Sequence, residues 1–367
     1  MYDDLPLFRQ RPRLLACLPW VSLGRWPTPV ERVPGLERLH GLPALWVKRD
    51  DLSSDLYGGN KVRKLEFSLA DALRRGCGTV MTMGAAGSNH VLATAVHGKR
   101  LGLRTTALLF DQPCAAYVRR NLLMDHHSQA RMVWASSIPL VPLAYLRERV
   151  TSLLRGERVY WLGPGGSSPL ACLGYVSAGM EIAEQVREGL VPEPEYVVSA
   201  MGTHGTSAGL WLGLRISGLR SRLVGVAVVE TAYCNAFLWA RLVNKIAALL
   251  NRLDPGIRAP SARPSDLVYV RDKLGKGYAH LTPEDVRAVR EAEEYGGLKL
   301  EGTYTGKALA AALDIGKELR GSASLLFVNT YNSVDFSPQI EGLDYRLLPR
   351  PLQRFFELPY RAMEDEL

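Results

Sequence analysis

Short apolar runs, each followed by a glycine-containing turn and a stretch of helical spacing, recur along this chain and constrain its fold more than any other feature. Such runs lie at Thr79–Met83, Arg104–Phe110, Val159–Leu162, Tyr196–Met201 and Arg222–Val229. Their side chains are mostly apolar at successive positions, which is typical of strands buried on both faces. Strands that alternate with helices predict an α/β fold, in which mostly parallel twisted sheets are flanked by helices.

The helical stretches follow the strands at the spacing that such a fold requires. They are expected at 91–102, 117–124, 143–154, 173–188, 235–252, 282–295 and 306–319, with a last buried strand at 324–329. The first 45 residues are rich in Pro and Arg and predict an extended arm, and 255–266 predict a loop. With 367 residues, 47% of them hydrophobic, the chain can form two α/β units.

The charge of the chain excludes some partners. There are 45 Lys and Arg against 37 Asp and Glu, a formal net charge of +8, but the basic residues are spread over the chain without a sustained cluster. A nucleic-acid-binding protein usually concentrates its basic residues in a patch or an arm. We therefore expect a mildly basic enzyme able to receive anions, with no nucleic-acid partner.

The cysteines and the apolar runs indicate a location. Five cysteines lie far apart without a CxxC pair, which argues against a disulfide framework or a zinc site. No set of His, Cys and acidic residues has the spacing of metal ligands, so no metal is expected. The first twenty residues do not resemble a secretory signal, and no run is long enough to span a bilayer. We predict a cytoplasmic protein without a membrane partner.

The most informative local stretch is Tyr57–Phe67. Its Gly-Gly-Asn turn leads into a helix whose apolar face repeats at helical spacing, so Lys61 lies at the helix start. The helix dipole and Lys64, three residues on, both disfavour a proton on Lys61. A neutral amine there is suited to bind a carbonyl cofactor. The alternative is a solvated surface lysine after a turn.

Two glycine-containing turns follow predicted strands and offer hydrogen-bond donors. The turn Gly202–Gly209 opens a helix, so its free amides and the hydroxyls of Thr203 and Thr206 can bind an anion. It has neither the Walker lysine nor a dinucleotide fingerprint, which makes a nicotinamide dehydrogenase a distant alternative. A plain strand-to-helix turn is the other reading. Ser88-Asn89-His90 stands in an equivalent place, either as a helix cap or as a group of donors to a carboxylate or phenolate.

Taken in order, these segments resemble the 1-aminocyclopropane-1-carboxylate deaminase and D-cysteine desulfhydrase family of pyridoxal-phosphate (PLP) enzymes. The resemblance runs from about residue 20 to 330. Its most specific part is Gly58-Gly59-Asn60-Lys61-Val62-Arg63-Lys64-Leu65-Glu66, and the other parts are 23–29, 48–51, 87–90, 165–170, 173–176, 202–209 and 304–307.

The resemblance implies a fold like that of the tryptophan synthase β subunit, and usually a homodimer. It implies a large domain from 1–64 and 172–345, a small domain at 65–171 and a C-terminal tail at 346–367. It also implies roles for particular residues. Lys61 would hold the cofactor as a Schiff base and move the Cα proton, while Asn89 would bind the phenolic oxygen of the cofactor.

The other implied roles concern the substrate and the phosphate. Ser88, with Asn89 and His90, would hold the substrate carboxylate, and Tyr278 and Tyr304 would lie over the substrate side of the ring. Glycine-flanked tyrosines of this kind are more often packing residues, which is the alternative. The remaining expected cofactor-binding residues are Lys64, Gly202, Thr203, His204, Gly205, Thr206, Thr305 and Thr330.

Thr305 distinguishes between the reactions of the family. The ring-opening deaminases carry a glutamate there, which can keep the pyridine nitrogen protonated and make the ring a deep electron sink. A neutral threonine favours elimination from a substrate with a leaving group on Cβ. The sequence therefore resembles the D-cysteine desulfhydrase branch, which releases pyruvate, ammonia and a thiol or sulfide. Ring opening of 1-aminocyclopropane-1-carboxylate to 2-oxobutanoate and ammonia is the alternative.

Two departures from the family pattern remain. The family usually has His-Thr-Gly-Gly after the last strand, where this chain has Asn329-Thr330-Tyr331-Asn332. The added bulk leaves open an altered substrate, or a PLP-binding protein whose catalysis is lost or changed. The family usually lacks the tail, which could be disordered, pack on a partner subunit or cover the site.

Overall fold

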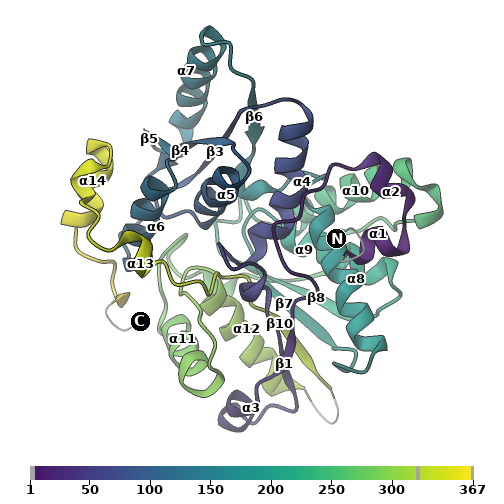
Figure 1. Ribbon diagram of the computed structural model, residues 1–367. Helices are drawn as coiled ribbons and strands as arrows, with labels where there is room; N and C mark the ends of the chain where they lie inside the picture. Colours follow the sequence, from purple (N-terminus) through teal and green to yellow (C-terminus); the bar gives the residue numbers. More distant parts are fainter. Residues whose placement is uncertain (1–4, 320–322, 365–367) are drawn as a thin grey trace.

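The computed structural model describes residues 5–319 and 323–364, and within them the strands form two separate sheets. Figure 1 shows the four-stranded sheet in the upper part of the molecule and the six-stranded sheet below it. The predicted α/β class with mostly parallel sheets is confirmed. No helix among these residues is long and apolar enough to cross a membrane.

The larger sheet has the strand order β1-β2-β10-β7-β8-β9. Only the edge pair β1 and β2 is antiparallel, and every other neighbouring pair is parallel. The strand bounds are Val30–Arg32 for β1, Leu45–Lys48 for β2, Tyr196–Met201 for β7, Arg222–Ala227 for β8, Leu267–Val270 for β9 and Leu325–Val328 for β10.

Helices cover both faces of this sheet, as its buried strands require. One face packs on α8, α9 and α10, and the other on α3, α11 and α12. The bounds are Pro34–His40 for α3, Leu173–Arg187 for α8, Gly205–Ile216 for α9, Ala236–Leu253 for α10, Pro283–Gly296 for α11 and Thr305–Glu318 for α12. A capping box of Thr282 and Asp285 starts α11 at the predicted signal.

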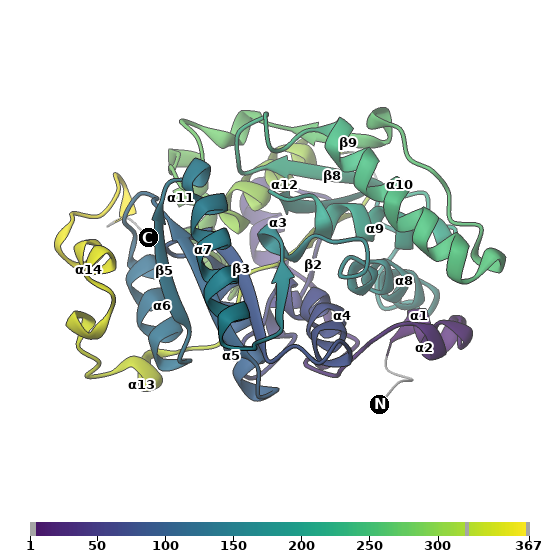
Figure 2. The ribbon, with the colours of Figure 1, turned by 90° about the horizontal axis from the view of Figure 1, so that it is seen from above.

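The smaller sheet is fully parallel, in the order β5-β4-β3-β6. Helix α7 covers one face, and α5 and α6 cover the other, as Figure 2 shows from above. The bounds are Thr79–Ala85 for β3, Asn89–Arg100 for α5, Arg104–Phe110 for β4, Ala116–His127 for α6, Arg131–Ser136 for β5, Val141–Leu154 for α7 and Val159–Leu162 for β6.

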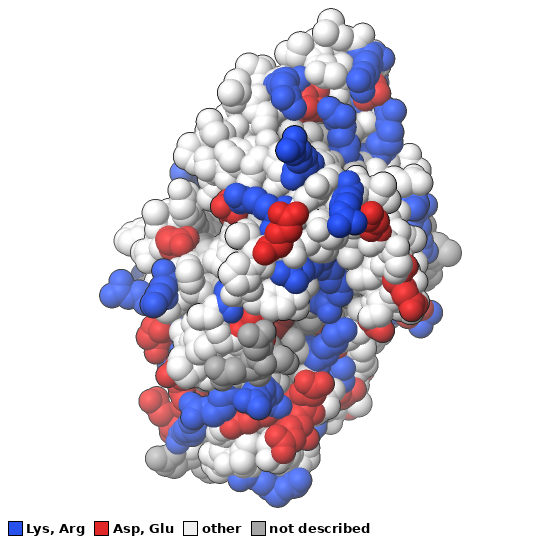
Figure 3. Space-filling view, turned by 90° about the vertical axis from the view of Figure 1, so that its left-hand side faces the viewer, with Lys and Arg blue, Asp and Glu red and all other residues white. Residues whose placement is uncertain are grey.

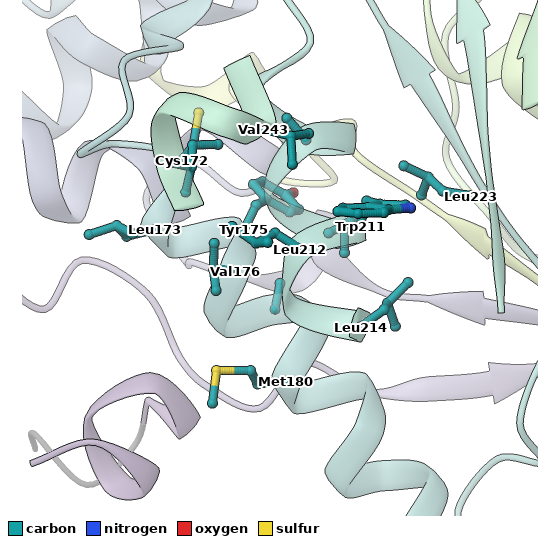
Figure 4. Packing of buried hydrophobic residues seen from close by; sticks show 14 of the residues in the cluster. Cys172, Leu173, Tyr175, Val176, Met180, Trp211, Leu212, Leu214, Leu223 and Val243 are labelled. Carbon is teal, nitrogen blue, oxygen red and sulfur yellow. The ribbon is translucent and has the colours of Figure 1, made fainter. Parts of the chain in front are cut away.

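Helices α8 and α9 pack unusually closely beneath the site. Figure 4 shows Tyr175 and Val176 of α8 beside Leu212 of α9. A Cβ at Gly213 of α9 would lie 2.1 Å from the carbonyl oxygen of Val176, so only glycine permits this approach. The contact fixes the position of α9 relative to α8. The first turn of α9 lines the pocket described below.

A buried ionic network joins the Lys61 helix, α4 (Asn60–Arg74), to the larger sheet. Arg63 donates to Asp50 at 2.8 and 3.0 Å and to Glu181 of α8 at 3.0 Å, and Lys48 donates to Glu181 at 2.5 Å. All four side chains are at most 1% exposed. The sequence motifs around residues 48–51 and 63 therefore hold the start of α4 in place.

The structure corrects one expectation about an irregular segment and bears out another. The first 45 residues are not simply an extended arm, because they contain α3, β1 and two short helices, α1 (Pro6–Gln10) and α2 (Arg13–Cys17). Leu5, Leu7 and Phe8 are buried in the core beside α8. The loop expected at 255–266 is confirmed, with two short 3₁₀ turns in it, and it leads directly into β9, a strand that the sequence analysis missed.

The tail folds back onto its own chain. Helix α13 (Ser337–Ile340) precedes the tail, and the tail itself contains α14 (Arg350–Glu357), whose Leu352 and Phe355 are fully buried against α6 and β5. Figures 1 and 2 place α14 beside these two elements. Figure 3 looks onto this side of the molecule, where basic and acidic side chains lie among one another.

Candidate active site

A pocket of about 780 Å³ lies between the two sheets, where parallel strands of both sheets end. Open α/β sheets usually bind ligands at this edge. Every predicted site residue lines it: Lys61, Lys64, Ser88, Asn89, His90, Gly202, Thr203, His204, Gly205, Thr206, Tyr278, Tyr304, Thr305 and Thr330. The structure thus brings together residues from six separate stretches of sequence.

Lys61 is placed by the glycine turn before it. Gly59 has φ +87°, and a Cβ there would lie 2.6 Å from the carbonyl oxygen of Tyr331. The backbone N–H of Asn60 donates to the Thr330 carbonyl oxygen at 3.1 Å, and its side-chain amide donates to Thr206 Oγ1 at 2.9 Å. The start of α4 is therefore tied to two other walls of the pocket.

Burial lowers the pKa of both Lys61 and Lys64. Burial, together with the nearby charge of Lys64, holds the pKa of Lys61 well below its usual value. Burial lowers the pKa of Lys64 to about 8. The lowered pKa favours the neutral amine of Lys61, which is the nucleophilic form.

Lys64 does not bond the 202–206 turn directly. Its Nζ donates to the Gly165 carbonyl oxygen at 2.5 Å and to Ser167 Oγ at 3.4 Å. Ser167 Oγ in turn lies 2.7 Å from Thr203 Oγ1, so a hydroxyl pair connects Lys64 to the turn.

The turn at 202–206 starts a helix at the pocket, as an anion-binding turn does. It joins the end of β7 to α9, and His204, with φ +64°, is the residue before the helix. The first amides of a helix have no partner within it, and here the first residues of α9, Gly205 and Thr206, line the pocket. Burial lowers the pKa of His204 to about 4, and its Nε2 accepts a hydrogen bond from the Asn235 N–H at 3.2 Å. A neutral His204 therefore serves to fix the turn.

Ser88, Asn89 and His90 start α5 on the opposite wall. Ser88 Oγ accepts the Val91 N–H at 3.4 Å, so the predicted capping role is real. Asn89 is oriented by Asn121, whose amide donates to Asn89 Oδ1 at 3.0 Å. His90 is buried with Nε2 3.0 Å from Thr82 Oγ1, and burial keeps its pKa well below the usual value.

Tyr278 and Tyr304 meet above the pocket. Their hydroxyl oxygens are 2.6 Å apart and their rings are edge to face, with centroids 6.0 Å apart. Burial raises the pKa of both phenols. The Tyr278 N–H donates to Glu230 Oε1 at 3.1 Å, which fixes its loop.

Glu301 is a pocket residue that the sequence analysis missed. Its carboxylate accepts three backbone N–H groups, from Thr303 at 2.7 Å, Tyr304 at 2.8 Å and Thr305 at 2.9 Å. The Thr305 hydroxyl also accepts a hydrogen bond from the backbone N–H of Glu301 at 3.0 Å. The carboxylate is thus committed to the start of α12. The available sequence signal for this role was a glutamate three residues before Tyr304, the residue that precedes α12.

The segment that departs from the family pattern is accommodated without filling the pocket. Asn332 Oδ1 accepts the Gly58 N–H at 2.6 Å, and the Tyr331 hydroxyl accepts from Arg120 at 2.6 Å. Asn329 bonds to the Tyr331 N–H and the Lys299 carbonyl. Asn332 thus supports the Gly58–Gly59 turn, while Arg120 and Lys299 hold Tyr331 and Asn329.

The donor set suits one cofactor in particular. A neutral buried amine suits an aldehyde, the N-terminus of α9 with two threonine hydroxyls suits a phosphate, and the amide of Asn89 suits a phenolic oxygen. Among the described residues no group of three or more His, Cys, Asp or Glu side chains could hold a metal ion. Fold and site together define the class of PLP enzymes built on parallel sheets.

Comparison with known proteins gives the family. The model of the family described as pyridoxal-phosphate dependent enzyme matches residues 21–330, and the chain belongs to this family. A putative 1-aminocyclopropane-1-carboxylate deaminase of Pyrococcus abyssi (strain GE5 / Orsay) is 35% identical over 322 residues, 86% of this chain and 92% of the relative. A D-cysteine desulfhydrase of Klebsiella pneumoniae (strain 342) is 36% identical over 325 residues, 86% of this chain and 94% of the relative.

A solved structure supports the same assignment. The crystal structure of an ACC deaminase homologue superposes with a TM-score of 0.75 and 31% identity, covering 93% of this chain and 99% of that chain. The predicted family, cofactor and fold are confirmed: the chain is a PLP-dependent lyase of this family.

Proposed function

We propose that this lyase eliminates the β-substituent of a small amino acid, most like D-cysteine, and releases pyruvate, ammonia and a thiol or sulfide. The observation that carries the proposal is Thr305, a neutral side chain in the pocket at the start of α12. Its hydroxyl is engaged by Glu301, and Glu301 itself is held by three N–H donors. Thr305 has no carboxylate, and the carboxylate of Glu301 is already engaged by these donors. Neither residue therefore offers a free carboxylate to the ring of a cofactor.

Each residue has a proposed task. The cofactor supplies, when bound, the electron-accepting ring that makes the Cα proton of an amino acid acidic. Lys61 would hold it until the amine of the substrate takes its place, and the freed Nζ would then remove the Cα proton as the leaving group departs from Cβ. The resulting aminoacrylate hydrolyses to pyruvate and ammonia.

The other pocket residues would orient the two ligands. Asn89 would bind the phenolic oxygen, and the turn Gly202–Thr206, with Lys64 through Ser167, would bind the phosphate. Thr330 would border the ring. Ser88 and the amides beside it, with His90, would hold the substrate carboxylate. Tyr278 and Tyr304 would cover the substrate.

A second candidate is ring-opening deamination of 1-aminocyclopropane-1-carboxylate, giving 2-oxobutanoate and ammonia. Its support is the name of the Pyrococcus abyssi relative. The third hypothesis, a PLP-binding protein without catalysis, rested on the segment Asn329–Asn332. Because the chain belongs to a family of PLP-dependent enzymes and Lys61, Ser88 and Asn89 line the pocket, we do not retain this hypothesis.

The proposal includes the organisation of the molecule. We propose a large domain of 1–64 and 172–345, a small domain of 65–171, and a homodimer in the cytoplasm. The two sheets, of which the smaller lies within 79–162, support the division. All five cysteines are free, which is consistent with a reducing compartment. Light scattering during gel filtration tests the dimer.

The decisive experiment is a spectrum of the purified enzyme, taken before and after adding D-cysteine, L-cysteine, 3-chloro-D-alanine or 1-aminocyclopropane-1-carboxylate. Pyruvate and 2-oxobutanoate are assayed in the same samples. Pyruvate from a D-amino acid is the expected result. Formation of 2-oxobutanoate from the cyclopropane alone would establish the second candidate instead.

A further inference from the structure

The C-terminal tail, residues 346–364 of the described chain, reaches the pocket wall through one side chain, Arg361. We propose that Arg361 is a positioning residue, which holds the Tyr278–Tyr304 pair in place from outside the pocket. The inference rests on the proposed function for the place of this pair over the substrate. It adds to the site a residue from a segment that lies beyond the family match at 21–330.

The tail is first anchored on the smaller sheet. The Phe355 ring packs edge to face on Trp134 of β5, and the Phe355 carbonyl oxygen accepts from Arg119 at 2.8 Å. Further along, the Arg361 N–H donates to the Cys114 carbonyl oxygen at 2.7 Å, and Glu364 Oε1 accepts the Ala116 N–H at 2.8 Å. The backbone of Arg361 is thus fixed to the N-terminal end of α6.

From this anchor the guanidinium crosses to the wall built on the larger sheet. Its Nη1 donates to the Ala279 carbonyl oxygen at 2.7 Å and to Thr303 Oγ1 at 2.9 Å, while Nε pairs with Glu364 at 2.6 Å. The Arg361 side chain is 3% exposed, and Thr303 is fully buried. Hydrogen bonds of a charged donor in such a place are stronger and more directional than those at a surface.

The two residues that Arg361 holds adjoin the two tyrosines. Ala279 follows Tyr278 and Thr303 precedes Tyr304. Ala279 has φ +61°, a conformation that non-glycine residues rarely adopt and that must be imposed by surrounding contacts. The bond to its carbonyl oxygen is one such contact. Loss of Arg361 therefore frees both loops that set the 2.6 Å contact between the hydroxyls.

The same network reaches the opposite wall. Thr303 Oγ1 also bonds to the Tyr117 hydroxyl at 3.3 Å, which accepts from Gln112 Nε2 at 2.9 Å. Gln112 Oε1 accepts the Gly87 N–H at 2.9 Å, in the turn that precedes Ser88. Arg361 therefore connects, through three side chains, the loops of the tyrosines with the turn proposed to hold the substrate carboxylate.

The test compares Arg361→Met and Arg361→Lys with Arg350→Met, which removes an exposed arginine of the same tail. Hydrogen exchange of the apoprotein is followed by mass spectrometry over 275–281 and 301–307. Arg361→Met is expected to accelerate exchange in both segments while peptides of α14 stay protected, and Arg350→Met is expected to change neither. Arg361→Lys, which keeps the charge and one donor direction, is expected to lie between them.

The second readout is kinetic. With the substrate that the wild type converts, Arg361→Met is expected to lower kcat by roughly ten- to a hundredfold, the scale of misplaced catalytic geometry, with little change in KM or in the visible absorbance band. Unchanged exchange in both segments, or an equal loss of kcat in Arg350→Met, would overturn the positioning role. A wild type that releases no keto acid would refute the proposed reaction alone, because the exchange measurement still decides the role of Arg361.

Discussion

The buried network beneath α4 permits a quantitative prediction for Glu181→Gln. Glu181 accepts Lys48 Nζ at 2.5 Å, two nitrogens of Arg63 at 3.0 Å and the Thr28 N–H at 2.9 Å, and its side chain is 1% exposed. Glutamine keeps the size of the side chain but removes the charge. Lys48 and Arg63, which are both buried, are then left with Asp50 as the remaining carboxylate of the network.

The size of the effect follows from the pKa of Glu181. Although burial opposes ionisation, Arg63 and Lys48 lower this pKa from 4.5 to about 2. A difference of that size corresponds to about 3 kcal/mol in favour of the folded state at neutral pH. It agrees with the roughly 3–5 kcal/mol that loss of one partner of a buried ion pair costs.

The sign of the pH dependence is fixed by the direction of this change. Because the folded-state pKa lies below the unfolded one, the stabilisation is complete above about pH 4.5 and is lost as the pH falls through about 2. The free energies of unfolding of wild type and Glu181→Gln should therefore differ by about 3 kcal/mol at pH 7 and converge at low pH.

Urea unfolding of the apoproteins, followed by circular dichroism at pH 7, 4 and 3, measures this difference. The matched control is Glu184→Gln, on the same helix but partly exposed and paired with Arg9, which should cost less than about 1 kcal/mol. A loss below about 1 kcal/mol for Glu181→Gln at pH 7, or one that does not change with pH, would refute the reasoning.

Three further predictions concern the pocket. Lys61→Ala should abolish the visible absorbance that borohydride bleaches and leave the circular dichroism unchanged; a persisting band would contradict the role of Lys61. Thr305→Glu should lower the yield of pyruvate, because it places a second carboxylate beside Glu301. An unaltered yield would count against the proposed role of the neutral Thr305 in elimination. Gly59→Ala should cost several kcal/mol and weaken cofactor binding, because its Cβ meets the Tyr331 carbonyl oxygen at 2.6 Å. Gly102→Ala, where φ is +73° and nothing lies within 4 Å of the added Cβ, should cost only about 1 kcal/mol, and equal losses in urea unfolding would refute the contact argument.

The strands could be predicted because burial on both faces leaves a direct sequence signature. Arg104–Phe110, Val159–Leu162 and Tyr196–Met201 were predicted to the residue. The turns after them could be placed at one site because parallel strands end at the same edge of a sheet. The helices α1 and α2 were missed because their five-residue length carries little periodicity, and packing against α8 stabilises them.

Two residues at or beside the site were missed in the sequence analysis for different reasons. Arg361 lies 82 residues from Ala279 and 58 from Thr303, and nothing near it in the sequence indicates these partners. Glu301 lies near the predicted Tyr304 and Thr305, yet its role as a cap depends on the bend that brings three amides to one carboxylate. Such contacts are decided by tertiary structure.

The segment Asn60–Phe67 shows why a short motif can report on a whole site. Lys61 and Lys64, one helical turn apart, face the pocket, whereas Arg63 points into the buried acids Asp50 and Glu181. Glu66 accepts the indole N–H groups of Trp20 and Trp26 from the N-terminal segment. Only the first pair lines the pocket and has a proposed role in the chemistry; the other two fix the helix that presents it. Substitution of Arg63 would therefore displace Lys61 without altering the charges that line the pocket, and the two lysines would lose function for a purely mechanical reason.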